Sequence, residues 1–235
     1  MLRSIKQLYG EKLRASDGEI GHVRDFYFND QQWAIRYVVA DTESWLAGRL
    51  VLISPHAFGS LHLDGDCLPV NLTRKQIEDS PAIELHKPVS RQYEDEYNRY
   101  YGWPSYWGGG EMWGAAGFPV IPPPNLMPAE KGSQGKPSPN SDDPHLRSTK
   151  ALDGYHIQTN DGAIGHVTDF MIDDKSWAIG CLVVEAGHWF AGKEIAISPK
   201  HVDAISHAQS KVFVKGTKEA LLEATEYQMP PLGVA

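Results

Sequence analysis

The sequence predicts an all-β fold in which one module of about 80 residues occurs twice. Residues 2–80 align with residues 146–224 at a constant offset of 144 without a gap, and about a third of the aligned positions are identical. Each copy also consists of short β-rich runs separated by turn residues. A gapless match of this density does not arise by chance, so we expect the same fold in both copies.

Five short motifs carry the repeat. They are LRSxKxL at 2–8 and 146–152, DGxIGHVxDF at 17–26 and 161–170, WAI at 33–35 and 177–179, WxAG at 45–48 and 189–192, and ISP at 53–55 and 197–199.

The first copy predicts six strands followed by a short helix. The expected strands span residues 12–15, 20–28, 33–40, 50–53, 60–63 and 67–72. Asp17-Gly18 is a hairpin-turn pair, and Asn29-Asp30 interrupts the next run. Thr73 is the expected N-cap of the short C-terminal helix, and the second copy repeats this arrangement. Six short strands with this spacing predict a small closed antiparallel barrel in each copy.

The run DGxIGHVxDFxxxDxxWAI, followed by WxxG and ISP, resembles the PRC-barrel family. That family includes the cytoplasmic barrel of the photosynthetic reaction-centre H subunit and the C-terminal barrel of a ribosome maturation factor. The resemblance covers both copies, about two thirds of the chain, and implies two six-stranded antiparallel barrels in tandem. The family mostly supplies scaffolds and interaction surfaces, so the resemblance specifies the fold more than the function.

Neither specialised role of those relatives is transferred. The H subunit has a membrane helix, whereas this sequence contains no stretch of that length and apolarity. The ribosome factor has a different N-terminal domain where this chain has the other barrel. The chain most resembles stand-alone bacterial proteins with two PRC barrels.

The expected domains are the first barrel at 1–81, a connector at 82–145 and the second barrel at 146–235. We expect the two barrels to pack as a pseudo-two-fold pair, an internal version of a homodimer.

The connector divides into three parts. A helix is expected over about 90–101, with Ser90 as its N-cap, and Gly102 and Pro104 end it. An aromatic and glycine-rich segment follows, and from 119 to 145 a Pro- and Ser-rich composition predicts disorder. The tyrosines of the helix share one stripe; they are Tyr93, Tyr97, Tyr100 and Tyr101.

Two interpretations of these aromatic residues remain open. The stripe either packs on the first barrel and closes one of its ends, or the segment docks on a partner or straps the barrels together. The candidate interaction residues in the connector are Tyr93, Tyr97, Trp103 and Trp107. Trp45 and Trp189, beside glycines at hairpin tips, either fold back on their own barrels or contribute to an interface.

Charge and composition indicate which partners and which cellular location to expect. A net charge of −8 without a basic cluster argues against nucleic-acid and anionic-lipid partners. Cys67 and Cys181 occupy non-equivalent positions, so we expect free thiols rather than a disulfide. The first residues contain no apolar signal core, and the expected location is the cytoplasm of a bacterium.

His22 and His166 recur at the same motif position, near Asp25 and Asp169. They suggest a metal or proton site. One histidine per copy is too few for a ligand set, so hydrogen-bonded strand residues are the favoured interpretation.

No nucleophile, base and orienting group occur together, and Ser54 and Ser198 precede prolines as ordinary helix starts. We therefore expect no catalytic residue, no cofactor and no metal. The favoured function is a non-catalytic cytoplasmic interaction or scaffold protein with an unidentified protein partner. The alternative is a small-ligand or metal sensor that uses the His22 and His166 regions.

Overall fold

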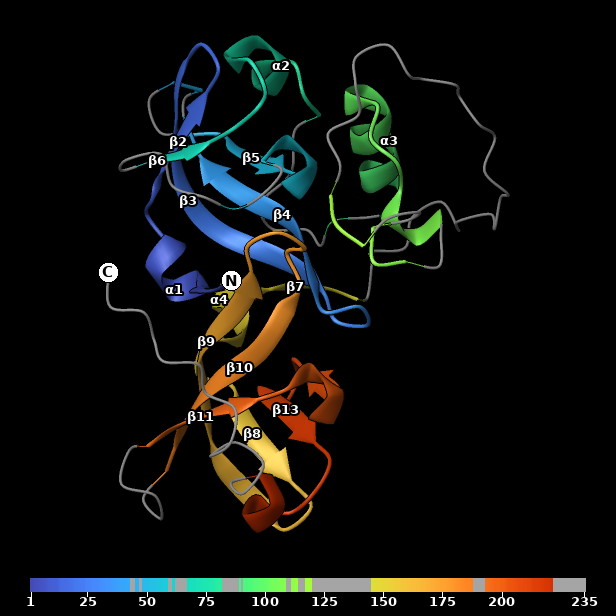
Figure 1. The fold of residues 1–235 in the computed structure, drawn as a ribbon. Helices are drawn as coiled ribbons and strands as arrows, with labels where there is room; N and C mark the ends of the chain where they lie inside the picture. The colour runs from blue at the N-terminus through green and yellow to red at the C-terminus, as the bar shows by residue number, and fades with distance from the viewer. Residues whose placement is uncertain are drawn as a thin grey trace. The chain divides into compact units, whose positions relative to one another are not determined.

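The fold is that of a computed structural model, which describes residues 1–42, 45–46, 48–58, 61, 67–81, 89, 91–108, 111–113, 117–119, 145–187 and 193–221 (Figure 1). Strands dominate these residues and helices are few and short, so the predicted all-β class is confirmed.

The chain forms two compact units. Unit 1 comprises Met1, Gln7–Ser148 and Asp174–Ala178, and unit 2 comprises Leu2–Lys6, Thr149–Asp173 and Ile179–Ala235. Each unit contains a short segment of the other copy, since Leu2–Lys6 belongs to unit 2 and residues 146–148 and Asp174–Ala178 belong to unit 1.

Unit 1 contains a sheet in the order β5-β4-β3-β2-β6, with β7 paired to β3. Its strands are β2 (Lys12–Ala15), β3 (Gly18–Asn29), β4 (Ala34–Asp41), β5 (Leu50–Ile53), β6 (Cys67–Pro69) and β7 (Leu146–Ser148). Its helices are η1 (Pro55–Ala57), α2 (Arg74–Glu78), α3 (Arg91–Tyr101) and η2 (Tyr106–Gly108). As expected, Thr73 caps α2, with Gln76 completing a capping box.

Unit 2 contains a sheet in the order β11-β10-β9-β8-β13-β12, with β1 paired to β9. Its strands are β1 (Leu2–Ser4), β8 (His156–Thr159), β9 (Gly162–Asp173), β10 (Ile179–Ala186), β11 (Glu194–Ile197), β12 (Val202–Ser206) and β13 (Lys211–Val214). Its short helices are α4 (Thr149–Leu152) and η4 (Pro199–His201), while α1 (Ile5–Leu8) follows β1 and lies partly in each unit.

Equivalent elements begin at the repeat offset. The pairs β2 and β8, β3 and β9, β5 and β11, and η1 and η4 each start 144 residues apart. Even an unusual backbone feature recurs, because Trp33 (φ 51°) and Trp177 (φ 59°) both adopt a left-handed conformation that is rare outside glycine.

The expected closed antiparallel barrel is not what the described residues form. Each sheet is open, and β6 and β13 run parallel to β2 and β8. A parallel pair requires a crossover, and the chain from β5 to β6 supplies it by passing to the far edge of the sheet. Most of the expected strand at 60–63 lies outside the described residues.

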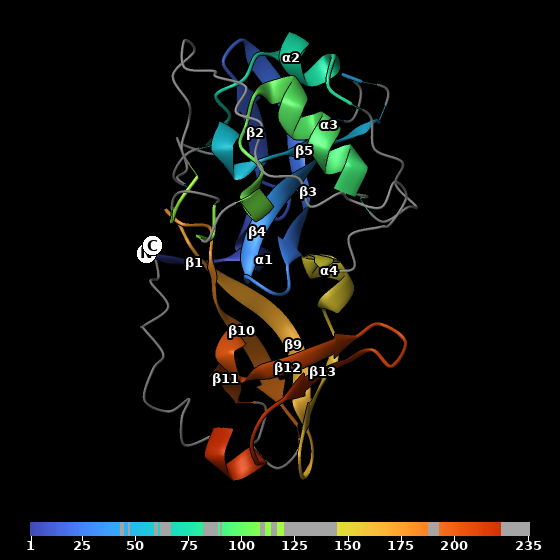
Figure 2. The ribbon, with the colours of Figure 1, turned by 90° about the vertical axis from the view of Figure 1, so that its right-hand side faces the viewer.

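The sheets differ in how their faces are covered. Strand β4 is buried at every position except its last, whereas β10 alternates between buried and exposed positions. Helix α3 lies across the side of the unit 1 sheet formed by β4 and β5 (Figures 1 and 2). The connector thus gives the first copy a second buried face, which explains why β4 has lost the alternation of a strand with one face in water.

Two glycines set the close approach of adjacent strands. A Cβ at Gly21 would lie 1.9 Å from the Asp41 carbonyl oxygen, and one at Gly165 would lie 2.0 Å from the Glu185 carbonyl oxygen.

We predict that Gly21→Ala and Gly165→Ala each lower the free energy of unfolding by about 1–3 kcal/mol, because the strands must separate. Denaturant titration measures this, with Gly187→Ala as the control because its nearest neighbour is 3.9 Å away. Losses no larger than that of the control would contradict the steric account.

Candidate functional site

The long second strand of each copy leaves an edge that its neighbour does not cover. Strand β3 has 12 residues and β2 has four, so β2 pairs only with the first part of β3. The LRS segment of the other copy pairs with the last three residues of the strand. Ser148 lies opposite Tyr27 in unit 1, and Ser4 lies opposite Met171 in unit 2, which is the same register at the repeat offset.

The recurring aspartates anchor these exchanged strands. The Ser148 hydroxyl donates to Asp25 Oδ2 at 2.6 Å in unit 1. In unit 2 the Ser4 hydroxyl donates to Asp169, and the Lys6 backbone N–H donates to Asp169 Oδ1 at 2.9 Å. Each carboxylate also accepts the N–H of the phenylalanine that follows it, at 2.7 Å. Asp25 and Asp169, two of the residues that suggested a site, therefore anchor the paired strands.

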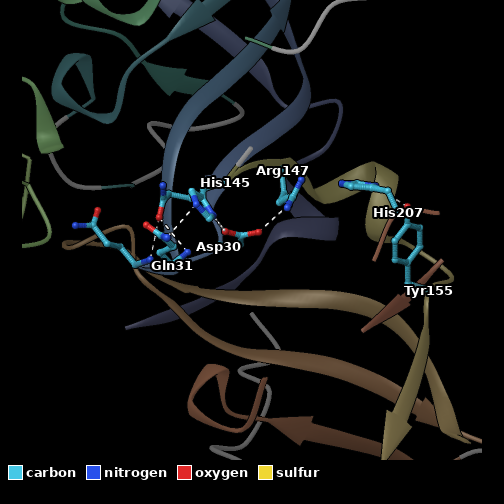
Figure 3. A network of polar contacts seen from close by, with 8 residues as sticks. Asp30, Gln31, His145, Arg147, Tyr155 and His207 are labelled. Atoms are coloured by element: carbon cyan, nitrogen blue, oxygen red, sulfur yellow. Dashed lines mark hydrogen bonds and ion pairs between the residues drawn. The ribbon is translucent and has the colours of Figure 1, made fainter. Parts of the chain in front are cut away.

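A second anchor in unit 1 surrounds Asp30 (Figure 3). Its carboxylate accepts from Arg147 Nε at 2.7 Å and contacts His145 Nδ1 at 2.9 Å. His145 Nε2 lies 3.0 Å from the Gln31 side-chain amide. Because the carboxylate can only accept from Nδ1, Nε2 is the acceptor for Gln31, and both ring nitrogens are engaged. His145, expected within the disordered segment, directly precedes β7, and residues 120–144 of that segment lie outside the described residues.

Unit 2 has a separate polar contact near its own β8 strand. The Tyr155 hydroxyl lies 2.8 Å from His207 Nδ1, and the two rings meet edge to face (Figure 3). This contact joins the turn before β8 to the turn between β12 and β13.

The two motif histidines lie in cross-strand rows. His166 is directly opposite His156 on β8 and Glu185 on β10, with His166 Nε2 3.6 Å from Glu185 Oε2. The corresponding row in the first copy is Lys12, His22 and Asp41. Sequence spacing did not reveal His156 because only strand register brings it beside His166. Across the part of the chain that the structure describes, no three His, Cys, Asp or Glu side chains are placed to hold a metal ion.

The tyrosine stripe packs on the first copy. Tyr97 is fully buried; its hydroxyl donates to the Leu52 carbonyl at 2.9 Å and accepts from the Ser54 N–H at 3.0 Å. The Tyr93 hydroxyl donates to the Pro81 carbonyl at 2.8 Å. The helix expected over 90–101 corresponds to α3, and Ser90, its expected cap, lies outside the described residues.

Glu94 is the centre of a buried network beneath the connector. Its side chain is fully buried, and Oε1 accepts from the Tyr37 hydroxyl at 2.9 Å and from the Tyr106 hydroxyl at 3.0 Å. Burial, followed by the Glu94 charge, raises the pKa of Tyr37 well above its usual value. Tyr37 therefore stays protonated and remains a donor to the carboxylate.

Arg36 completes this cluster from a β-bulge. The register shifts between Tyr27 and Phe28 opposite this residue, and a bulge re-aims side chains. Its guanidinium lies 3.9 Å from the Tyr106 ring centroid and 4.5 Å from that of Trp113, typical of cation–π contacts. Sequence analysis missed Arg36, Glu94, Tyr106 and Trp113, because their pairing is visible only once the connector is docked.

The remaining candidate residues differ in burial and in what they contact. Trp103 is buried and stacks on His56, and Trp107 is half-buried beside Tyr106. Trp45 is half-buried with the Arg74 guanidinium 4.6 Å from its ring centroid, so it contacts its own copy. Trp189 lies outside the described residues. Cys67 and Cys181 are free thiols, as expected, and burial raises the pKa of Cys181 to about 11.

We predict that Tyr37→Phe lowers the free energy of unfolding by about 1–3 kcal/mol, because the buried Glu94 carboxylate loses a hydrogen-bond donor. The matched control is Tyr100→Phe in helix α3, because the Tyr100 side chain is 42% exposed. For this variant we expect the free energy of unfolding to change by about 0.5 kcal/mol or less. Denaturant unfolding of both variants measures the difference. Equal effects would show that the Glu94 network contributes nothing specific.

The comparisons with known proteins place the second copy in a family. The family model of the PRC-barrel domain matches residues 150–221. A search of curated proteins found no match. Among the helices that the structure describes, none combines the length and apolar composition needed to cross a bilayer. The matched residues include strands β8 to β13, so the resemblance is confirmed for the second copy, which carries a PRC-barrel domain over residues 150–221.

Proposed function

We propose that this protein is a non-catalytic interaction or scaffold protein built from two PRC-barrel modules, acting in the bacterial cytoplasm on a protein partner. The first copy counts as a PRC-barrel module through its gapless repeat match and through elements that begin at the same offset. The internal pseudo-dimer of the two modules is part of this proposal.

The observation that carries it is the role of the aspartates that recur in both copies. Asp25 and Asp169 hold serine hydroxyls of exchanged strands and backbone N–H groups. The oxygens of both carboxylates are thus used to hold neighbouring backbone and serine groups in place. The most chemically suggestive side chains of the repeat thus support strand-to-strand association, which is a binding function.

The sensor alternative retains one observation in its favour. His156, His166 and Glu185 occupy adjacent positions across three strands of unit 2, and both His166 and Glu185 are substantially exposed. Imidazole and carboxylate are ligands for divalent transition metals. Rotation of these exposed side chains would be needed to bring them onto one ion.

Metal titration separates the two functions. For a scaffold, we expect Zn²⁺ or Ni²⁺ to shift the unfolding temperature equally in the wild type, in His166→Gln and in His201→Gln, an exposed histidine away from the row. A ligand that binds only the folded state raises its stability by mass action. A metal-induced rise that His166→Gln abolishes and His201→Gln retains would favour the sensor.

Partner capture tests the binding function itself. We expect in-cell cross-linking of the tagged chain to recover one protein in a fixed ratio, with the yield reduced by Trp45→Ala and unchanged by His22→Gln. Tryptophans that are partly exposed are frequent interface anchors. Absence of any cross-linked protein, combined with the metal response described above, would overturn the scaffold function.

A further inference from the structure

The edge of β9 that holds residues 2–4 is a binding site already filled by a peptide strand. We propose that this site also accepts the same segment from a second copy of the chain, so that residues 2–6 exchange between chains. This inference rests on the proposed interaction function and deepens it by naming one partner.

Matching sequences are the first argument. LRSxK occurs at 2–6 and again at 146–150, and both strands lie on their acceptors in the same register. Both acceptors present an aspartate to the serine of the incoming strand. The binding rule therefore depends on the LRS sequence and not on its position in the chain.

The β9 acceptor also leaves room for Leu2 and makes a backbone contact at Lys6. A Cβ at Gly180 would lie 3.0 Å from Leu2 Cδ2, so any larger residue there would press on the leucine. The equivalent position in the first copy is Arg36, which is committed to the rings of Tyr106 and Trp113. The Lys6 backbone N–H is a second donor to Asp169. Chemically, the site takes an extended strand with leucine first and serine third.

The segment can leave without unfolding its acceptor. Strand β1 has three residues, and only residues 2–6 of the first 148 belong to unit 2. A short segment with few hydrogen bonds opens at a lower free energy than the sheet it covers. Opening exposes unpaired backbone groups on β9, and such an edge pairs with another strand.

A second copy is the occupant that fits. Exchange of an identical element reproduces every native contact of the segment and needs no new surface. The product is an oligomer in which the Ser4 of one chain donates to Asp169 of another. Its amount should rise with protein concentration, whereas the closed form does not depend on concentration.

Engineered disulfides test the exchange in the full-length chain, in a Cys67→Ala, Cys181→Ala background. Leu2 and Asp173 are directly opposite and both half-buried, and opposite residues on paired strands are close enough for a disulfide. One chain carries Leu2→Cys with one tag and another carries Asp173→Cys with a second tag. A chain with both substitutions reports the closed form.

After mixing and mild oxidation, we expect a cross-linked product containing both tags. We also expect its loss when the acceptor chain additionally carries Asp169→Ala, while Asp203→Ala, at an exposed carboxylate of the same unit, leaves it unchanged. The doubly substituted chain at low concentration should form its internal disulfide.

Absence of the two-tag product, while the internal disulfide forms, would overturn the exchange but leave binding to a different protein intact. Failure of the internal disulfide itself would overturn it as well, because the pairing of Leu2 with Asp173 would then be wrong.

Discussion

The structure depends on one constraint: strands β3 and β9 are each three times as long as the strand that precedes them in the chain. Strands β3 and β9 have 12 residues, and their neighbours β2 and β8 have four. An uncovered edge of this kind exposes backbone donors and acceptors, which favours pairing with another chain. The LRS segments cover both edges reciprocally, and the recurring aspartate at the middle of each motif fixes them there. We call this arrangement, an LRS strand held on β3 or β9 by Asp25 or Asp169, a strand clasp. Because the motif occurs in both copies, two clasps of the same register exist.

The two copies have diverged around this shared clasp. In the first copy, the bulge position holds Arg36, and the connector docks over the sheet through Glu94 and Tyr97, so that β4 is buried on both faces. In the second copy, the bulge position is Gly180 and the strand keeps an exposed face. Of the described connector residues, Tyr97, Trp103 and Tyr106 are buried, which favours packing on the first copy over a free docking peptide. The less covered second sheet and its clasp remain the parts best suited to exchange or to a partner.

Local sequence patterns predicted the elements well and their pairing poorly. Five of the six strands expected in the first copy, the Thr73 cap and the tyrosine stripe of α3 follow from spacing and composition. The partner of Asp25 is 123 residues away and that of Asp169 is 165 residues away, so neither contact has a local signature. The same holds for Glu94, which became a network centre only through the docked connector. A closed barrel was expected because strand counting ignores crossovers, and the parallel pairs arise from such crossovers.

Hydrogen exchange of single-residue variants tests the clasp most directly. The account predicts that Asp25→Ala increases amide exchange in residues 146–148 and leaves residues 2–4 unchanged, because its serine partner is Ser148. It predicts the reverse for Asp169→Ala, whose partner is Ser4. Mass spectrometry of peptides from the two LRS segments measures both at once. Faster amide exchange of residues 2–4 in Asp25→Ala, with residues 146–148 unchanged, would mean that each copy holds its own LRS strand. That result would contradict the pairing of each LRS strand with the other copy.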